Sequence, residues 1–470
     1  MTSTINQTTR RPVGISKDGT KIRRVINMNP IQQKHKQYLV PGVAPYYEDP
    51  LVLVEGKGRH VVDSEGRRYL DFFGGILTVS VGHAHPRVAE AIAKQAQQLL
   101  HTSQLYLTES IVNLAERLAR LTPGALQQSF FTTSGTEANE TAIMMAQLAT
   151  GHQDIVALRH SYSGRSQVTM GLTGQAEWKL GGAGMALPIR HTHNAYCYRC
   201  PFGKTPNRCG LECAKDMEEF IRTSTSGHIA AYLAEPIQGV GGFITPPPEF
   251  FQETVPIAKK YGALFIDDEV QTGFGRTGKM FGIEHYGVNP DMMVFAKGIA
   301  NGMPIAASIT TPEVASFYRG PTISTFGGNP VATQAALATL DVITAENLVD
   351  NAKIMGEVLR RGLESLSDHY PIVGDVRGKG LMQGLEFVRH DKNPAGDLAL
   401  EFLERTRKQG LLVGKGGLYG NVIRIAPPLS VTHQEIQEGL QAMDDALRTL
   451  YHNHSDMQDV TSTRIAYDAP

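Results

Sequence analysis

The sequence predicts an α/β fold in which helices cover a mostly parallel sheet, followed by a smaller α+β unit near the C-terminus. Short aliphatic runs alternate with helical patterns along the chain, as they do in βα-layered proteins. These runs are apolar at successive positions, which is typical of strands covered on both faces. With 470 residues, the chain is also long enough for about three domains.

The composition excludes some classes of protein. Lys and Arg number 45 and Asp and Glu 46, for a formal charge of −1, so the basic excess of a dedicated nucleic-acid binder is missing. Apolar runs stay well short of the roughly 18 residues that a membrane-spanning helix needs. These observations favour a small-molecule partner and involve neither nucleic acid nor a membrane.

The two ends of the chain differ from its middle. Residues 1–30 carry six Lys or Arg and one acid, Asp18, without the apolar stretch of a secretory signal. We interpret residues 1–45 as an N-terminal arm and residues 451–470 as a flexible tail. A cytoplasmic location is favoured, and the mitochondrial matrix is the alternative because the arm is rich in Arg and Thr and poor in acids.

Two amphipathic helices are predicted ahead of the sheet. Residues 86–100 begin with Pro86, which suits the first turn of a helix, and residues 109–121 show the same periodicity. The first helix would bury Val88, Ile92 and Leu99, and the second Leu114, Leu118 and Leu121.

Buried strands are predicted over residues 154–158, 230–236, 263–267 and 292–296. Near the C-terminus, Thr432 and Glu435 have the spacing of a capping box. The helix that follows them would bury a stripe made of Ile436, Leu440, Met443 and Leu447. We place the smaller α+β unit from about residue 336 onward.

The segment SGTEANE (residues 134–140) is the sharpest local signal. It follows the apolar pair Phe130-Phe131 and opens a helical run. A turn of small residues at a helix start leaves the N–H groups of Gly135 and Thr136 at the positive end of the helix dipole, where phosphate binds. The alternative is an ordinary helix N-cap.

Charged residues follow two of the predicted strands. Asp267, Asp268 and Glu269 stand at the end of one, where ligands bind in open α/β sheets. A metal site is less favoured than a counter-charge for a ring nitrogen, because no further ligand stands nearby. Lys297 ends another strand, where burial would lower its pKa and make it reactive. The alternative is a lysine that has reached the surface.

A phosphate-binding helix start, a strand-end Asp and a strand-end Lys are together what pyridoxal phosphate requires. The sequence therefore predicts this cofactor.

Six motifs resemble, in order and spacing, those of the class III aminotransferases, over residues 45 to 450. They are SGTEANE, EPIQGVGG (235–242), DDEVQTGFGRTG (267–278), AKGIANGMP (296–304), STFGGNP (324–330) and RGKGLMQGLE (377–386). The resemblance implies an aspartate-aminotransferase-like fold (fold type I), with a mostly parallel seven-stranded sheet. It is greatest to the mitochondrial-type alanine-glyoxylate aminotransferase branch.

With this family in view, we divide the chain into five parts. Residues 1–45 form the arm, 46–85 an N-terminal segment of the small domain, 86–335 the large cofactor domain, 336–450 the C-terminal small domain and 451–470 the tail. The large domain would contain a Cys-rich insertion at about residues 190–215.

The resemblance also implies roles for cofactor-binding residues. Lys297 would be the Schiff-base lysine and proton shuttle, and Asp268 would pair with the pyridine nitrogen. Val270 would pack under the ring, and Gln271 would reach the ring hydroxyl. Gly135 and Thr136 would hold the phosphate, with Thr325 contributed by the other subunit of a homodimer, which could assemble further into a tetramer.

Two further cofactor contacts are implied, Tyr162 and Glu235. Tyr162 matches the aromatic residue that stacks on the ring. The sequence departs from the usual pattern at the next position, because Ser163 replaces a histidine.

The resemblance implies that Arg424 clamps the α-carboxylate of the substrate, a bidentate task that suits guanidinium. In 4-aminobutyrate and ornithine relatives a glutamate masks this arginine, and Val240 stands at that place here. Amino donors such as alanine and acceptors such as glyoxylate or pyruvate are therefore favoured, in a ping-pong reaction. Ile76 is a further substrate contact, and Arg165 could bind a distal carboxylate or be a residue behind the site.

Four functional alternatives stay open. The chain could be a 4-aminobutyrate or ornithine ω-aminotransferase that uses 2-oxoglutarate, or an amino-acid racemase or a phospholyase on the same scaffold. A non-catalytic, metal-stapled regulatory homologue is the alternative outside enzymes.

All four cysteines fall in the insertion, at Cys197, Cys200, Cys209 and Cys213. This spacing could close a structural zinc site, with His191 and His193 as less favoured ligands. Two disulfides or four free thiols are the alternatives.

Overall fold

The structure is a computed structural model that describes residues 28–43, 45–182, 187–206 and 208–454. Most of the predicted arm (1–27) and of the predicted tail (455–470) lies outside the described residues. The chain divides into two compact units, Met1–Leu53 and Val54–Pro470.

In the first unit, the helix α1 (Pro30–Tyr38) lies within the predicted arm, where no helix was expected. Asn29 caps it, and Pro30 occupies its first turn, as helix starts favour. Gln32 closes a capping box and donates from Nε2 to Asp49 Oδ1 at 2.9 Å. This part of the arm therefore has local structure of its own.

The second unit contains a seven-stranded sheet in the order β4-β10-β9-β8-β7-β5-β6. Its strands are β4 (Gln128–Thr132), β5 (Asp154–Leu158), β6 (Ile189–Thr192), β7 (Ile229–Ala234), β8 (Leu264–Asp268), β9 (Met292–Phe295) and β10 (Ala306–Thr310). Only β10 runs antiparallel to its neighbours, so the prediction of a mostly parallel sheet is confirmed. β5 coincides with its predicted range, and β7, β8 and β9 differ from theirs by one or two residues at the ends.

Helices cover both faces of this sheet. They include α5 (Gly135–Thr150), α6 (Gln167–Leu172), α7 (Glu212–Ser224), α8 (Phe250–Lys260) and α9 (Pro312–Ala315). α5 packs against β4, β7, β8, β9 and β10, while α8 packs against β7 and β8. Ala142 of α5 shares a buried cluster with Leu233 and Ile266 of the strands. Because both faces are covered, the central strands β7 and β9 are apolar throughout.

The predicted helices ahead of the sheet are present as α3 (Pro86–Gln98) and α4 (Glu109–Leu121). Leu114 and Leu118 are fully buried, as expected. The prediction for Leu99 is wrong, because its side chain is 42% exposed. The helix ends at Gln98 and the backbone of Leu99 is extended, so Leu99 leaves the face that carries Val88.

The remaining strands form two four-stranded sheets, in the orders β1-β2-β3-β13 and β11-β12-β15-β14. The first contains β1 (Leu53–Lys57), β2 (His60–Asp63), β3 (Arg68–Asp71) and β13 (Leu411–Leu412). The second contains β11 (Val373–Lys379), β12 (Met382–Phe387), β14 (Gly414–Gly416) and β15 (Val422–Ile425). β3 pairs in parallel with β13, so an early and a late segment of the chain share one sheet.

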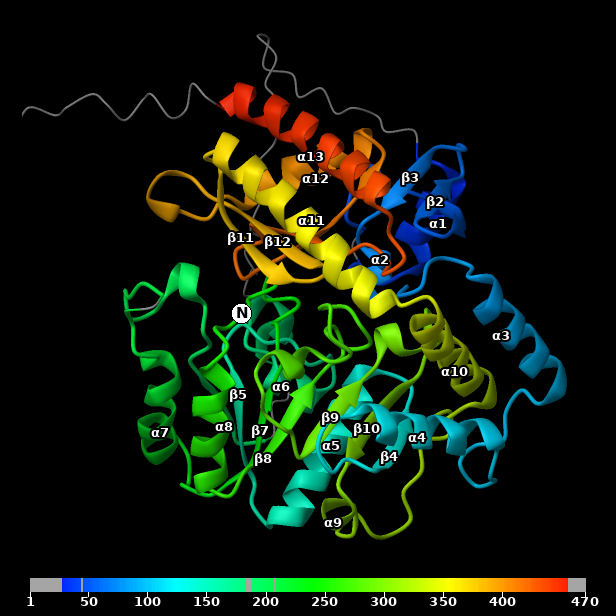
Figure 1. The fold of residues 1–470 in the computed structure, drawn as a ribbon, viewed down its shortest axis with the longest axis vertical. Coiled ribbons are helices and arrows are strands. Elements are labelled where there is room, and N and C mark those ends of the chain that lie inside the picture. Colours follow the sequence, from blue (N-terminus) through cyan, green and yellow to red (C-terminus); the bar gives the residue numbers. More distant parts are fainter. Residues whose placement is uncertain (1–27, 44, 183–186, 207, 455–470) are drawn as a thin grey trace, which may run out of the picture. The chain divides into compact units, whose positions relative to one another are not determined.

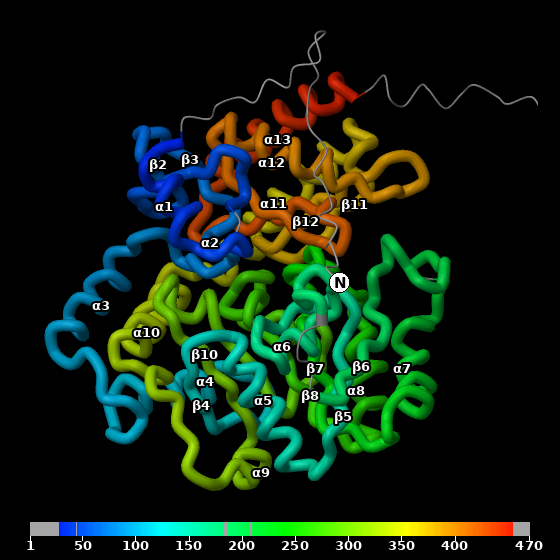
Figure 2. Tube along the Cα trace, turned by 180° about the vertical axis from the view of Figure 1, so that it is seen from behind, coloured from blue at the N-terminus to red at the C-terminus, as the bar shows by residue number. Residues whose placement is uncertain are grey.

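The helices α2 (Gly74–Leu77), α10 (Pro330–Ala345), α11 (Leu348–His369), α12 (Gly396–Lys408) and α13 (His433–His454) complete the unit. Short 3₁₀ turns are η1 (Ala176–Gly182), η2 (Cys197–Arg199), η3 (Gly282–His285), η4 (Lys297–Ala300) and η5 (His390–Lys392). α11, α12 and α13 gather with β11 and β12 on one side of the seven-stranded sheet (Figure 1), and the view from behind shows the same separation (Figure 2).

The capping box ahead of α13 is confirmed: Thr432 N donates to Glu435 Oε2 at 2.9 Å, and Glu435 N donates to Thr432 Oγ1 at 3.2 Å. Ile436, Met443 and Leu447 are fully buried, as predicted. The proposed domain boundaries stay a prediction.

One buried side chain connects the seven-stranded part to the smaller sheets. Arg276 is only 2% exposed and donates from Nη1 to the backbone oxygens of Leu381, at 3.1 Å, and Pro427, at 2.5 Å. Burial lowers the pKa of Arg276 to about 9.

None of the helices in the described ranges combines the length and the apolar character that crossing a membrane requires.

Candidate active site

One cavity lies where β8 and β9 end and α5 begins. It is lined by eight residues that the sequence assigned to the cofactor: Gly135, Thr136, Tyr162, Glu235, Asp268, Val270, Gln271 and Lys297. The structure adds Asn139, Ser163, Gly164 and Ala296, which had no predicted role. Residues far apart in the sequence therefore meet at the carboxyl edge of the sheet, where α/β proteins bind ligands.

The phosphate-binding part of the prediction concerns the start of α5. Ser134 is the N-cap, and its side chain accepts a hydrogen bond from Glu137 N at 3.4 Å. A Cβ on Gly135 would lie 3.1 Å from Val270 Cγ2, a tight contact, so glycine favours the close approach of the helix start to the loop after β8. Gly135 and Thr136 thus present backbone N–H groups at the edge of the cavity.

Asp268 is 3% exposed and held in a fixed orientation. Its Oδ2 accepts from Asn139 Nδ2 at 2.9 Å, and its Oδ1 accepts from Val270 N at 3.1 Å. Burial raises the pKa of Asp268, while the two hydrogen bonds and the charge of Lys297 oppose that increase. A carboxylate oriented in this way is suited to pair with a protonated ring nitrogen. Asn139 was missed in the sequence, although it stands four residues after Gly135, on the same side of α5.

Glu235 connects two loops of the cavity. Its Oε1 accepts from Tyr162 N at 3.0 Å, and its Oε2 accepts from Gly239 N at 2.7 Å. Burial and the neighbouring charge of Asp268 raise the pKa of Glu235. The ring of Tyr162 meets the ring of Trp178 edge-on, with centroids 5.2 Å apart. Glu235 thus fixes the backbone that presents Tyr162 to the cavity.

Ser163, which stands where the family has histidine, is buried beside these loops. Its backbone oxygen accepts from Asn139 Nδ2 at 3.1 Å, so Asn139 joins the Ser163 loop to Asp268.

Lys297 begins η4 directly after β9 with a positive φ of 43°. Such a conformation costs free energy in a non-glycine residue, and it is common in functional sites. Burial lowers the pKa of Lys297, the charges of Asp268 and Glu235 oppose this, and Arg424 lowers it further. The amine is therefore within electrostatic reach of the residues predicted to bind cofactor and substrate.

The polar atoms of the cavity fit a pyridine that carries a phosphate and a hydroxyl. Among the described residues, Gln271 Oε1, Ser163 Oγ and Asn139 Oδ1 are buried and have no hydrogen-bond partner. Leaving such atoms unpaired costs about 1–3 kcal/mol each. A bound polar ring would satisfy them, and Lys297 and Asp268 offer the amine and the counter-charge that such a cofactor needs.

The predicted substrate residues do not line this cavity, although the charge of Arg424 acts on Lys297. Arg424, on β15, is 4% exposed, and its guanidinium lies 4.9 Å from the ring centre of Phe73 and 5.8 Å from that of Phe243. Its Nε donates to Lys415 O at 3.1 Å. Aromatic rings around a guanidinium exclude water, which strengthens its attraction for a carboxylate.

Val240 lies beside this arginine. Its backbone oxygen accepts from Gly417 N at 2.9 Å, and its side chain is 8% exposed. A Cβ on Gly416 would lie 2.9 Å both from Val240 O and from Arg424 Nε. The backbone of Val240 therefore lies close to the arginine, and this position carries an apolar residue.

Besides Arg424, three predicted residues do not line the cavity. Arg165 and Thr325 are exposed, and Ile76 is 45% exposed with a φ of 66°. Arg165 follows Gly164 of the cavity lining, and its backbone N donates to Thr136 Oγ1 at 3.4 Å. The roles of all three stay predictions.

The four cysteines line one small pocket between η2 and α7, and all are free thiols. Nowhere in the described ranges do three or more His, Cys, Asp or Glu side chains converge to hold a metal ion. His191 Nε2 contacts Leu172 O at 3.0 Å, and His193 faces Asp216 at 3.8 Å. The structure therefore supports neither the zinc site nor the pair of disulfides.

Comparisons with known proteins agree with this geometry. Residues 43–447 match the family model described as Aminotransferase class-III. "Alanine--glyoxylate aminotransferase 2 homolog 2, mitochondrial" of Arabidopsis thaliana is 45% identical over 417 residues, which cover 88% of this chain and 86% of the relative. The human "Alanine--glyoxylate aminotransferase 2, mitochondrial" is 39% identical over 450 residues, covering 90% and 87%. "Leucine/methionine racemase" of Thermococcus litoralis is 36% identical over 409 residues, covering 85% and 90%.

The fold also has solved neighbours. An amine transaminase from an uncultivated Pseudomonas species, solved in its PLP-bound form, has a TM-score of 0.83 and 31% identity, with 88% of this chain and 98% of that chain covered. Class III aminotransferases use pyridoxal phosphate, and the residues of the cavity fit that cofactor. The chain belongs to the class III aminotransferases and is a pyridoxal-phosphate-dependent transaminase.

Proposed function

We propose that this transaminase moves the amino group of an amino acid such as alanine, or a similar α- or β-amino acid, to glyoxylate or pyruvate. The observation that carries the proposal is the apolar Val240 beside Arg424. Position 240 carries no acid, so no carboxylate at that position competes with the carboxylate of the substrate for Arg424. Planar guanidinium binds a carboxylate through two parallel hydrogen bonds, which also orients the α-carbon.

Eight residues of the cavity have a task in this reaction. When bound, pyridoxal phosphate supplies an electron sink for the charge left at the α-carbon after proton removal. Lys297 Nζ takes that proton and later returns it, and burial favours its neutral, basic form. Asp268, oriented by Asn139, keeps a proton on the ring nitrogen. Gly135 and Thr136 bind the phosphate, Gln271 the ring hydroxyl, and Val270 and Tyr162 pack on the ring.

We further propose that the enzyme is a homodimer in which Thr325 completes the phosphate site of the other subunit. Leu100, Leu105, Tyr106 and Leu107 form an exposed apolar segment, with Leu107 91% exposed. Phe326, next to Thr325, is 61% exposed, and its ring lies 5.1 Å from that of His101. Contiguous exposed apolar surface of this kind is typical of subunit interfaces. Light scattering will give the subunit number and distinguish a dimer from a tetramer.

The experiment for the substrate is a screen of purified holoenzyme with alanine, 3-aminoisobutyrate, 4-aminobutyrate and ornithine as donors. The acceptors are glyoxylate, pyruvate and 2-oxoglutarate. Turnover of alanine with glyoxylate or pyruvate is expected. Turnover of 4-aminobutyrate or ornithine without turnover of alanine would contradict the proposal. Chiral analysis of the same mixtures detects racemisation, and its dominance over transfer would favour the racemase alternative. Whether the enzyme works in the cytoplasm or the mitochondrial matrix stays a prediction.

A further inference from the structure

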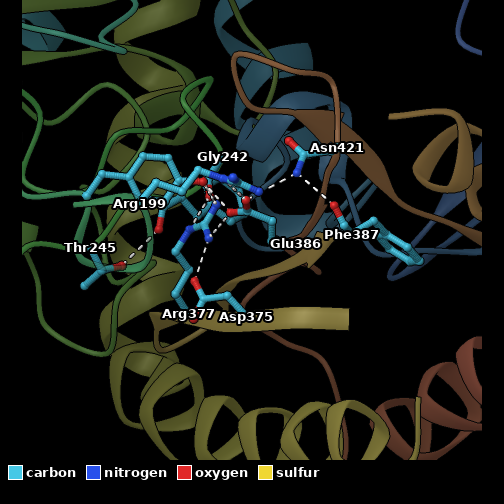
Figure 3. A network of polar contacts seen from close by, with 10 residues as sticks. Arg199, Gly242, Thr245, Asp375, Arg377, Glu386, Phe387 and Asn421 are labelled. Carbon is cyan, nitrogen blue, oxygen red and sulfur yellow. Dashed lines mark hydrogen bonds and ion pairs between the residues drawn. The ribbon is translucent and has the colours of Figure 1, made fainter. Parts of the chain in front are cut away.

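The Cys-rich insertion is joined to the sheet β11-β12-β15-β14 by a buried polar network centred on Glu386 (Figure 3). Glu386, on β12, has a fully buried side chain. From the insertion, Tyr196 donates its hydroxyl to Oε2, and Arg199 donates from Nε to Oε1 at 2.5 Å. The known activity gives the insertion no task, so these contacts call for an explanation.

The small sheet supplies the other partners of Glu386. Arg377, on β11, donates from Nη1 to Oε2 at 2.6 Å, and Asn421 donates from Nδ2 to Oε1 at 3.2 Å. Although burial alone would raise it, Arg377, Tyr196 and Arg199 lower the pKa of Glu386 below its ordinary value. The side chain is therefore a carboxylate at neutral pH, with both oxygens engaged.

Arg377 extends the network to the EPIQGVGG loop. Its Nε donates to Gly242 O at 2.8 Å, and its guanidinium lies 4.9 Å from the ring centre of Tyr196. Asp375 accepts from Nη1 at 2.6 Å. The same loop contains Val240, whose oxygen accepts from Gly417 N. Glu386 thus holds the insertion, β11 and the EPIQGVGG loop at one point.

That point is adjacent to the substrate arginine. Strand β12 pairs with β15 so that Gly384 lies opposite Arg424 and Glu386 lies opposite Val422. Arg424 is therefore two residues from the network along each strand. Because strands move as rigid elements, a shift of Glu386 would change the position of Arg424 relative to the EPIQGVGG loop.

We propose that Glu386, anchored by Tyr196 and Arg199 of the insertion, is a positioning residue for recognition of the substrate carboxylate. The inference rests on the proposed role of Arg424. In this proposal, the insertion holds β15, which carries Arg424, in a fixed position relative to the EPIQGVGG loop, which contains Val240. Glu386 touches neither cofactor nor substrate in this scheme, so its loss should weaken carboxylate binding and spare the chemical step.

The first variant is Glu386→Gln, which keeps the shape and removes the charge. The matched control is Asp397→Asn, which breaks an exposed ion pair with Arg389 in the same part of the chain. We expect KM for alanine to rise by about tenfold in Glu386→Gln, since displacements of about 1 Å can cost up to a hundredfold. kcat should stay within about twofold of the wild type, as expected when only binding is weakened. Asp397→Asn should leave both constants unchanged.

A second measurement isolates the carboxylate. Aminooxyacetate and O-methylhydroxylamine both capture the carbonyl of the bound cofactor, and only the first carries a carboxylate. In Glu386→Gln, the rate of the cofactor's absorbance change should fall for aminooxyacetate and stay the same for O-methylhydroxylamine. Equal changes for the two reagents, or no change for either, would overturn the proposal.

Two further variants separate the causes of failure. Tyr196→Phe removes a single hydroxyl from the network, so it tests the inference if Glu386→Gln does not fold; a folded Tyr196→Phe enzyme with unchanged aminooxyacetate capture would overturn it. Arg424→Ala tests the proposed function alone. If Arg424→Ala captures aminooxyacetate as fast as the wild type, the role of Arg424 is wrong. If only Arg424→Ala is slow, the positioning role of Glu386 is wrong.

Discussion

Replacing Val240 with Glu should weaken the binding of α-amino donors such as alanine. The position that a Cβ on Gly416 would occupy lies 2.9 Å from Val240 O and 2.9 Å from Arg424 Nε. These two atoms are therefore at most about 6 Å apart, which is twice that distance. A carboxylate placed at that distance would attract the guanidinium by about 3 kcal/mol at an effective dielectric constant of about 20. That attraction competes with the carboxylate of the substrate for Arg424.

The cost of burying the new carboxylate reduces this effect. We therefore expect the KM for alanine to rise by about tenfold to a hundredfold, since each 1.4 kcal/mol is a factor of about ten. The KM for 4-aminobutyrate should fall relative to that for alanine, because a terminal amine places no carboxylate at Arg424. Steady-state kinetics with saturating pyruvate measures both constants.

Val240→Gln is the matched control, since it has nearly the same size and no charge. It should change the KM for alanine by less than about threefold, as a substitution that adds bulk without charge. Equal increases in Val240→Glu and Val240→Gln would show that bulk rather than charge causes the effect. The electrostatic argument would then be refuted.

Three further predictions concern the cofactor cavity and the strand β8 that leads to it. Lys297→Ala should lower kcat by about 10⁴-fold or more, as loss of a nucleophile and base does, and borohydride should no longer fix the cofactor to the chain; retained fixation would contradict the assignment. Asn139→Ala removes the 2.9 Å bond to Asp268 and should weaken cofactor binding by about tenfold, equivalent to one charge-assisted hydrogen bond; fluorescence titration of the apoenzyme measures this, and unchanged affinity would contradict it. Burial, followed by the charge of Glu269, raises the pKa of Asp267 far above its ordinary value. The protonated form is therefore the stable one, and stability should be lost as the pH rises through that raised pKa. The urea midpoint of the apoenzyme should fall with rising alkalinity, and Asp267→Asn should reduce the slope; identical slopes would contradict this origin.

The sequence predicted the sheet well because burial on both faces leaves a direct trace in it. β5 and β8 each contain a short run of apolar residues, at 155–158 and 264–266. In layered proteins such a run is typical of a strand that is covered on both faces. The cofactor cavity was also predictable, since Asp268 and Lys297 each follow such a strand and Gly135 opens a helix. These patterns are local in the sequence, and the fold then brings the two strand ends and the helix start together at one edge of the sheet.

Other features depend on contacts that local patterns do not contain. Asn139 acts through hydrogen bonds to Asp268 and Ser163, and its position within α5 alone does not reveal them. Leu99 was misplaced because the periodic pattern continues one residue beyond the end of α3. The cysteine spacing suggested zinc, but among the described residues the thiols do not form a group that could hold a metal ion, although all four line one pocket.

The two backbone bonds of Arg276 have a consequence for how this enzyme can change. Its guanidinium donates hydrogen bonds to the main-chain oxygens of Leu381 and Pro427. Every amino acid has a main-chain oxygen, so these bonds do not depend on the side chains at the two positions. Side chains in these segments can therefore be substituted without breaking the hydrogen bonds that connect Arg276 to the smaller sheets. Arg424, the proposed substrate residue, lies three residues before Pro427. Residues near the proposed substrate site can therefore change while the hydrogen bond from Arg276 to Pro427 is kept. A protein built in this way could acquire new amino donors through a few substitutions, with its cofactor machinery unaltered.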